Sequence, residues 1–136
     1  MGFRGQYQFE VVGDVIHVAF EGMFSESTSR KISELVEHHV SSLEGKGFYM
    51  LIDLSNYEGS TPDAHKVGNQ HAIWLEGQNC LGKAIVISER VVLEIARSQQ
   101  KFLSQSILRS EVFSNKTQAE QWLADLATNT SGDLSV

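Results

Sequence analysis

Two short, almost uninterrupted apolar runs constrain the fold of this chain more than any other feature. They are Phe48–Leu54 and Leu81–Ile87, and both have the length of a strand. Such runs are typical of central strands that are covered on both faces. A segment with helical spacing, which begins near Thr61 with Pro62 at its first helical position, separates them. Strands joined through a helix lie parallel in one sheet, so the runs predict an α/β fold.

The rest of the chain alternates between strand-type and helix-type patterns. Two segments of alternating apolar and polar residues, joined by the Gly13-Asp14 pair, predict an antiparallel hairpin with a type II′ turn; they are Gln6–Val12 and Val15–Glu21. Apolar residues at helical spacing and one short strand-like segment predict further elements. These are helices from Ser25, from about Glu89 to Ser104 and after Ser114, and a strand at Ser110–Phe113.

The predicted order of elements is ββαβαβαβα, in an α/β domain with a single five-stranded mixed sheet and about four helices. The first strand is expected at an edge of the sheet, antiparallel to its neighbour, and the two apolar runs side by side inside it. We assign residues 1–127 to one domain. Residues 128–136 are rich in Ser, Thr and Gly and are expected to form a flexible C-terminal tail.

The composition excludes several classes of protein. The chain has 136 residues, of which 41% are hydrophobic and 21% charged, as in soluble globular domains. Seventeen acidic against eleven basic residues give a net charge of −6, which argues against a nucleic-acid partner. We expect no integral membrane segment and no secretory signal, because no apolar run is long enough. The single cysteine, Cys80, cannot form an internal disulfide, so we expect a cytoplasmic protein.

The histidines do not have the spacing of metal ligands. His38 and His39 are adjacent, and His65 and His71 are six residues apart on one predicted helix. Two ligands on a helix need a spacing of three or four residues to share a face. We therefore predict no metal site and interpret these residues as surface or boundary histidines.

The sequence has no arrangement typical of an enzyme. A nucleophilic cysteine needs a nearby base, and His71 on the preceding helix leaves that question open, but we interpret Cys80 as a small, semi-buried side chain. No glycine loop or nucleophile elbow follows a strand, and Gly82-Lys83 is interpreted as a turn. We predict no catalytic residue, no cofactor and no enzymatic activity.

The stretch between the first apolar run and the next helix is the first candidate site. Its candidate residues are Asp53, Ser55, Tyr57, Gly59, Ser60 and Thr61. In open α/β sheets, ligands bind where strands end and helices begin. Ser60 and Thr61 would place hydroxyls at the positive end of a helix dipole, where an added phosphate is favoured. The alternative is that Thr61 is only a helix cap and Gly59 only a turn residue.

The second candidate is an apolar patch on the helix that follows. Ile73, Trp74 and Leu75 are consecutive, so one helical stripe cannot bury all three. The patch lines a ligand pocket, forms a homodimer interface, or is covered by the next helix through Phe102. The sequence leaves these three alternatives open.

The element order, the strand end Asp53-Leu54-Ser55 and the hydroxyl-rich turn after it resemble STAS domains, the fold of the sporulation anti-sigma-factor antagonist SpoIIAA. The chain is most similar to the SpoIIAA-like branch of small bacterial proteins of unknown role, sometimes grouped with the CRAL-TRIO lipid-binding proteins. The resemblance covers about residues 7–126. Its other motifs are Tyr57-x-Gly59-x-Thr61-Pro62-x-Ala64, Lys83-Ala84-Ile85-Val86, and Val112-Phe113 with Ala119-x-x-Trp122-Leu123.

The resemblance implies two hypotheses of function. The first is a non-enzymatic regulatory or protein-interaction module that docks a partner through the turn around Ser60 and the helix after it. True antagonists carry Asp-Ser-x-Gly at this turn, with a phosphorylated serine, whereas this chain has Gly59-Ser60-Thr61-Pro62. The second is a carrier or sensor of a small hydrophobic or lipid-like ligand, held between the second and third helices near Trp74 and Phe102.

Overall fold

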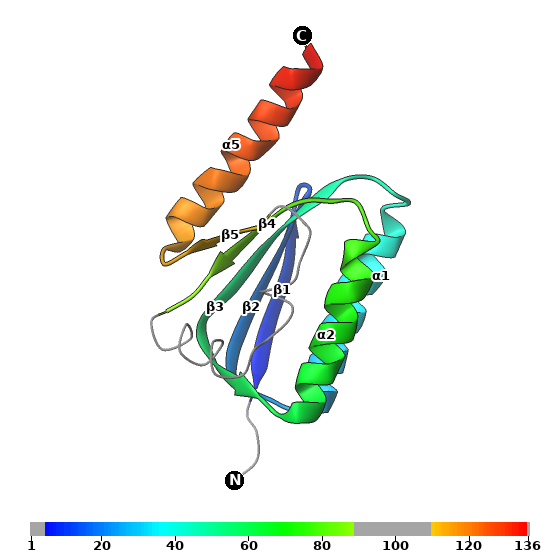
Figure 1. Cartoon of the computed structure of the whole chain (residues 1–136), viewed down its shortest axis with the longest axis vertical. Helices are drawn as coiled ribbons and strands as arrows, with labels where there is room; N and C mark the ends of the chain where they lie inside the picture. Colours follow the sequence, from blue (N-terminus) through cyan, green and yellow to red (C-terminus); the bar gives the residue numbers. More distant parts are fainter. Residues whose placement is uncertain (1–4, 89–109, 136) are drawn as a thin grey trace.

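The computed structural model describes residues 5–88 and 110–135 (Figure 1). The described part contains five strands and three helices. In chain order these are β1 (Gln6–Val12), β2 (Val15–Phe24), α1 (Glu26–Ser42), β3 (Phe48–Ser60), α2 (Pro62–Glu76), β4 (Cys80–Val86), β5 (Ser110–Phe113) and α5 (Lys116–Ser135). The helix expected from about Glu89 to Ser104, with its Phe102, lies outside the described residues.

The strands form one mixed sheet in the order β1-β2-β3-β4-β5. β1 lies at an edge and pairs antiparallel with β2, and every other pair is parallel. The predicted α/β class, the N-terminal hairpin and the adjacency of the two apolar runs are therefore confirmed. The hairpin turn contains Gly13 with φ +60°, a conformation that glycine adopts at little cost.

β3 is longer than its apolar run predicts. We expected it to end at Leu54, but it continues to Ser60 because its second half pairs with the end of β2. Gly22 lies opposite Tyr57 and Phe24 opposite Ser60, with irregularities in the register on the way. The predicted turn is therefore mostly strand, and a single residue, Thr61, separates it from α2.

Both helices that follow the first strands begin where the sequence predicts. The Ser25 hydroxyl accepts a hydrogen bond from the Thr28 N–H (3.4 Å) at the start of α1. The Thr61 hydroxyl accepts one from the Ala64 N–H (3.1 Å), with Pro62 at the first position of α2. Each cap is worth about 1 kcal/mol of helix stability.

The helices lie on opposite faces of the sheet (Figure 1). α1 and α2 lie side by side over one face, and α5 packs on the other near β4 and β5, with its C-terminal half extending past the sheet. α5 thus includes most of the segment 128–136, whose flexibility stays a prediction. No helix in the described ranges is long and apolar enough to cross a membrane.

Successive residues of the central strands point to alternate faces of the sheet, so their side chains contribute to two apolar cores. The larger core cluster, under α1 and α2, includes Ile16, Phe24, Val36, Met50, Ile52, Leu54 and Ile85. The smaller core cluster, under α5, consists of Tyr49, Leu51, Ala84, Val86, Ala119, Leu123 and Leu126. On α1, Leu35 is 40% exposed, and the buried stripe contains Ile32, Ser33 and Val36.

Candidate functional site

A cavity of about 80 Å³ lies between α1, α2 and the face of the sheet that they cover. Most of its wall is apolar and comes from both helices and from β2, β3 and β4. The apolar lining side chains include Val18, Phe20, Ile32, Val36, Met50, Ile52, Ala64, Ala72 and Leu75.

The cavity exists because both helices present small side chains toward the sheet. α2 contributes Ala64, Gly68 and Ala72 at successive turns, and α1 contributes Ser29 and Ser33. A Cβ atom added to Gly68 would meet nothing within 4 Å, so there is room at this point of the wall.

Lys83 is the most unusual group in the wall. Its side chain is 2% exposed, on the face of β4 that carries Ile85, and it lines the cavity. Burial lowers the pKa of its amine, against a smaller opposite influence from Cys80 and Glu76. The interpretation of Gly82-Lys83 as a turn is therefore wrong: both residues lie inside β4.

His65 and His71 contribute ring nitrogens to the same wall. His65 Nε2 is buried and has no hydrogen-bond partner among the described residues. His71 Nδ1 lies 2.8 Å from Glu37 Oε2, which connects α2 to α1, and its ring stacks on Trp74 with centroids 6.1 Å apart. Burial lowers the pKa of His71 and outweighs the hydrogen bond and charge of Glu37, which act in the opposite direction.

Cys80 is a buried free thiol. Its Sγ donates a weak hydrogen bond to the Gly82 carbonyl oxygen (3.5 Å), and burial raises its pKa, so the thiol form is favoured. His71 Nδ1 is hydrogen-bonded to Glu37, and among the described residues no hydrogen bond joins Cys80 to His71.

The residues of the first candidate site separate onto different parts of β3. The Asp53 Oδ1 accepts hydrogen bonds from the N–H (3.0 Å) and the hydroxyl (2.6 Å) of Ser55. The Tyr57 hydroxyl is hydrogen-bonded to Ser60 Oγ, and both of these residues line the cavity. Asp53 instead lines a second, more polar hollow of about 150 Å³ on β1, β2 and β3.

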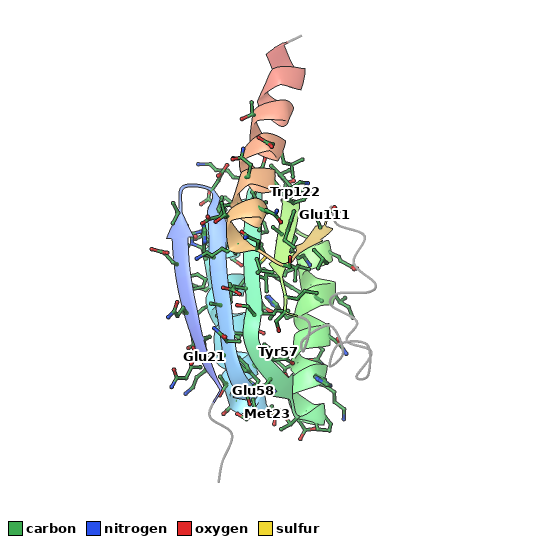
Figure 2. All side chains as sticks on the ribbon, turned by 90° about the vertical axis from the view of Figure 1, so that its left-hand side faces the viewer. Glu21, Met23, Tyr57, Glu58, Glu111 and Trp122 are labelled. Carbon is green, nitrogen blue, oxygen red and sulfur yellow. The ribbon has the colours of Figure 1, made fainter. Side chains whose placement is uncertain are left out.

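Two other members of that candidate set have roles in the backbone. Thr61 is the cap of α2, as one of the alternatives from the sequence states. Gly59 adopts φ +134°, which disfavours any residue with a side chain, at the irregular end of the β2–β3 pairing. Figure 2 shows Tyr57 and Glu58 at this end of the sheet, away from Trp122 of α5.

The three consecutive apolar residues of the second candidate site have three different environments. Leu75 is buried and lines the cavity. Trp74 is partly buried and packs against the larger core cluster. Ile73 is 69% exposed on the outer side of α2. Their proposed companion Phe102 lies outside the described residues.

Sequence reasoning missed Lys83 and the small residues of α2 that line the cavity. Lys83 is the one charged residue inside the apolar run Leu81–Ile87. A charged side chain in an otherwise apolar strand was the available signal for an unusual site. The alternation of Ala64, Gly68 and Ala72 at helical spacing was the signal for the space itself. Among the described residues, no three His, Cys, Asp or Glu side chains converge as a metal site would need.

No family model and no curated protein matches this sequence significantly. Solved structures do match its fold. An uncharacterised protein of the DUF3478 family with a SpoIIAA-like fold, from Shewanella loihica PV-4, is 17% identical with a TM-score of 0.65, over 90% of this chain and 96% of that one. An anti-sigma factor antagonist from Mycobacterium paratuberculosis is 14% identical with a TM-score of 0.57, over 86% and 92%. The chain therefore has a SpoIIAA-like α/β fold.

Proposed function

We propose that this protein is a non-enzymatic, SpoIIAA-like regulatory module that binds a small, largely apolar molecule in the cavity between α1, α2 and the sheet. The cavity itself is the observation that carries the proposal. It favours the ligand carrier or sensor over the pure protein-interaction module, the two hypotheses that the sequence leaves open. The sequence predicts a pocket between the second and third helices, whereas the described residues that line this cavity come from α1, α2 and the sheet.

The energetics of packing support a ligand. Protein interiors are close-packed, so a space of about 80 Å³ between two helices and the sheet leaves its wall without some of the usual packing contacts. Apolar walls with a few polar groups are typical of small-molecule sites. A bound molecule would recover the lost contacts.

The chemistry of the side chains supports binding without catalysis. Burial favours the thiol form of Cys80, and its Sγ is hydrogen-bonded to the Gly82 carbonyl oxygen and not to a base. Cys80 is thereby not activated as a nucleophile. A free, buried thiol also supports a cytoplasmic location, where cysteines stay reduced.

Docking of a protein partner, or of a second copy as a homodimer, is the second candidate function. The exposed Ile73 on the outer side of α2 favours it, because a large apolar side chain there gains free energy when covered. The similarity to an anti-sigma factor antagonist supports it further. Ser60 and Thr61 stay candidates for a phosphate that would regulate such docking, although the Ser60 hydroxyl is bonded to Tyr57 and the Thr61 hydroxyl caps α2.

The ligand proposal is tested by titrating the protein with 1-butanol and recording methyl NMR spectra. We expect saturable shifts at methyls of the cavity wall, such as Val36, Ile52 and Leu75, and none at Leu123 and Leu126 under α5. Absence of saturable shifts, or shifts confined to other surfaces, would contradict the proposal.

A matched pair of variants makes this test specific. In Gly68→Leu the new side chain has room and fills the cavity, so butanol binding is expected to disappear while the fold is kept. Gly77→Leu is the control: Gly77 is exposed at the end of α2, its φ is −86°, and an added Cβ makes only ordinary contact there. Butanol binding should survive in the control.

A further inference from the structure

The described part of the cavity wall contains a basic side chain and no acidic one. Lys83 is the one Lys or Arg among the described lining residues, and none of these residues is Asp or Glu. The other polar side chains among the described lining residues are the hydroxyls of Ser29, Ser33, Tyr57 and Ser60, the amide of Asn69 and the two imidazole rings. All of these can donate a hydrogen bond to an anion.

Within residues 5–88 and 110–135, Lys83 forms no ion pair of the kind that a buried cation normally has. Neither ion pair among the described residues includes it, since Glu26 pairs with Arg30 and Glu37 with His71. Glu76 influences Lys83 electrostatically but makes no bond with it and does not line the cavity. Lysine is rarely fully buried unless it is paired. Because Lys83 is 2% exposed and lines the cavity, an anion bound in the cavity would give it a counter-ion.

We propose that the ligand of this cavity is a small amphiphile with an apolar body and a single carboxylate, and that Lys83 Nζ binds the carboxylate. This inference rests on the proposed function of the cavity and specifies its ligand. The apolar wall from α1 and α2 takes the body of the ligand, and the carboxylate lies at β4. His65 Nε2, which is buried without a partner, is available as a second polar contact inside the wall.

Size and charge both favour a monocarboxylate over a phosphate. One ammonium neutralises one negative charge, whereas a phosphate dianion would leave a second charge buried without a partner, at high cost. A volume of about 80 Å³ is also smaller than the 150 Å³ or so that holds benzene in an engineered cavity. The expected body is therefore a short aliphatic chain.

The test compares butyrate with 1-butanol, which share a chain length but differ in charge. For the wild-type protein we expect butyrate to bind at least about tenfold more tightly, the usual worth of a hydrogen bond to a charged group. Inorganic phosphate should not compete with butyrate. If butanol binds as tightly as butyrate, or phosphate displaces butyrate, the carboxylate inference is wrong while the cavity proposal stands. If neither probe binds, the proposed function itself fails.

Variants of Lys83 test whether its amine binds the carboxylate of butyrate. Lys83→Met keeps the length of the side chain and should reduce butyrate affinity at least about tenfold, with 1-butanol affinity unchanged or higher. Lys83→Gln repeats the test with a polar side chain in case the first variant folds poorly. Lys66→Met, on an exposed position of α2, is the control and should leave both affinities unchanged. Wild-type preference for butyrate in a folded Lys83 variant would overturn the inference.

Discussion

The two faces of the sheet are packed in opposite ways. Under α5, the smaller core cluster is wholly apolar, Trp122 packs on Phe113 with ring centroids 5.8 Å apart, and the missing side chain of Gly82 lets Leu126 approach the strand closely. Under α1 and α2, residues of the larger core cluster line a cavity, and the buried Lys83 lies in the wall beside them. Figure 2 shows Trp122 on the α5 side, apart from Tyr57 at the other end of the sheet.

Under the proposed function, the face under α1 and α2 binds a ligand, and the face under α5 serves packing. Both faces are built from the same strands, so strand composition does not explain why one is filled and the other is not. Small residues on α1 and α2 and a charge on β4 lower the stability of one face, and such costs are typical of sites that function requires. The α5 face is expected to contribute stability alone.

The largest expected effects come from truncating one leucine on each face. Leu123→Ala and Leu75→Ala should each lower the free energy of unfolding by about 2–5 kcal/mol in urea titrations, because both side chains are buried. Their effects on binding should differ. Leu75→Ala enlarges the cavity and should admit longer alcohols than 1-butanol, whereas Leu123→Ala should leave the preferred chain length unchanged. Equal ligand preferences in the two variants would contradict the comparison.

A second expected effect is stabilisation by removing the charge at Lys83. Lys83→Met should raise the free energy of unfolding at pH 7 by about 1–4 kcal/mol, as when buried charges are replaced by apolar side chains. The folded-state pKa of Lys83 lies below its value of 10.5 in the unfolded chain. The wild-type penalty is therefore complete below the folded pKa and is relieved as the pH rises toward 10.5.

The difference between variant and wild type should accordingly shrink between neutral and alkaline pH. Urea unfolding of both proteins at several pH values measures this difference, in which the titration of groups that do not interact with Lys83 cancels. A Lys83→Met variant that is less stable than wild type at pH 7 would show that the amine has a stabilising partner.

The cavity-filling variant should also be more stable than wild type, by a smaller amount. Gly68→Leu removes a mid-helix glycine, which costs up to about 1 kcal/mol relative to good helix formers, and adds contacts in the empty volume. Thermal unfolding with the Gly77→Leu control measures this gain. A large loss of stability in Gly68→Leu would mean that the wall at this point has no room.

His71 should make the free energy of unfolding depend on pH in the weakly acidic range. Burial lowers its pKa below 6.5, so the unfolded chain takes up a proton more readily than the folded one. Stability should therefore fall as the pH drops through the window from 6.5 down to the folded pKa. His71→Gln, which can still donate to Glu37, should flatten this part of the pH profile. An unchanged acid slope in the variant would assign the effect to other groups.

The smallest expected effect concerns the outer side of α2. Ile73→Glu should change the free energy of unfolding by no more than about 0.5 kcal/mol, since the side chain is 69% exposed, and should leave butanol binding intact. Sedimentation of wild type and variant tests the docking alternative in the same experiment. A lower mass for the variant would place a homodimer interface on this surface.

The sequence predicts the fold well because each element has a local signal. Period-2 and helical patterns, Ser25 and Thr61 as caps, and two apolar runs lead to the observed sheet order. The end of β3 could not be predicted, since it depends on pairing with β2 far along the chain. The cavity was missed for the same reason: Ser33, Gly68 and Lys83 come from three elements, and only the assembled fold brings them together.

The most direct test of a ligand site under α1 and α2 is the position of a bound probe. Intermolecular NOEs from the methyl protons of butyrate should reach the methyls of Val36 and Ile52, which line the cavity from α1 and β3. NOEs confined to Ile73 on the outer surface of α2, or to Leu123 under α5, would place the binding site elsewhere and contradict the assignment of function to this face.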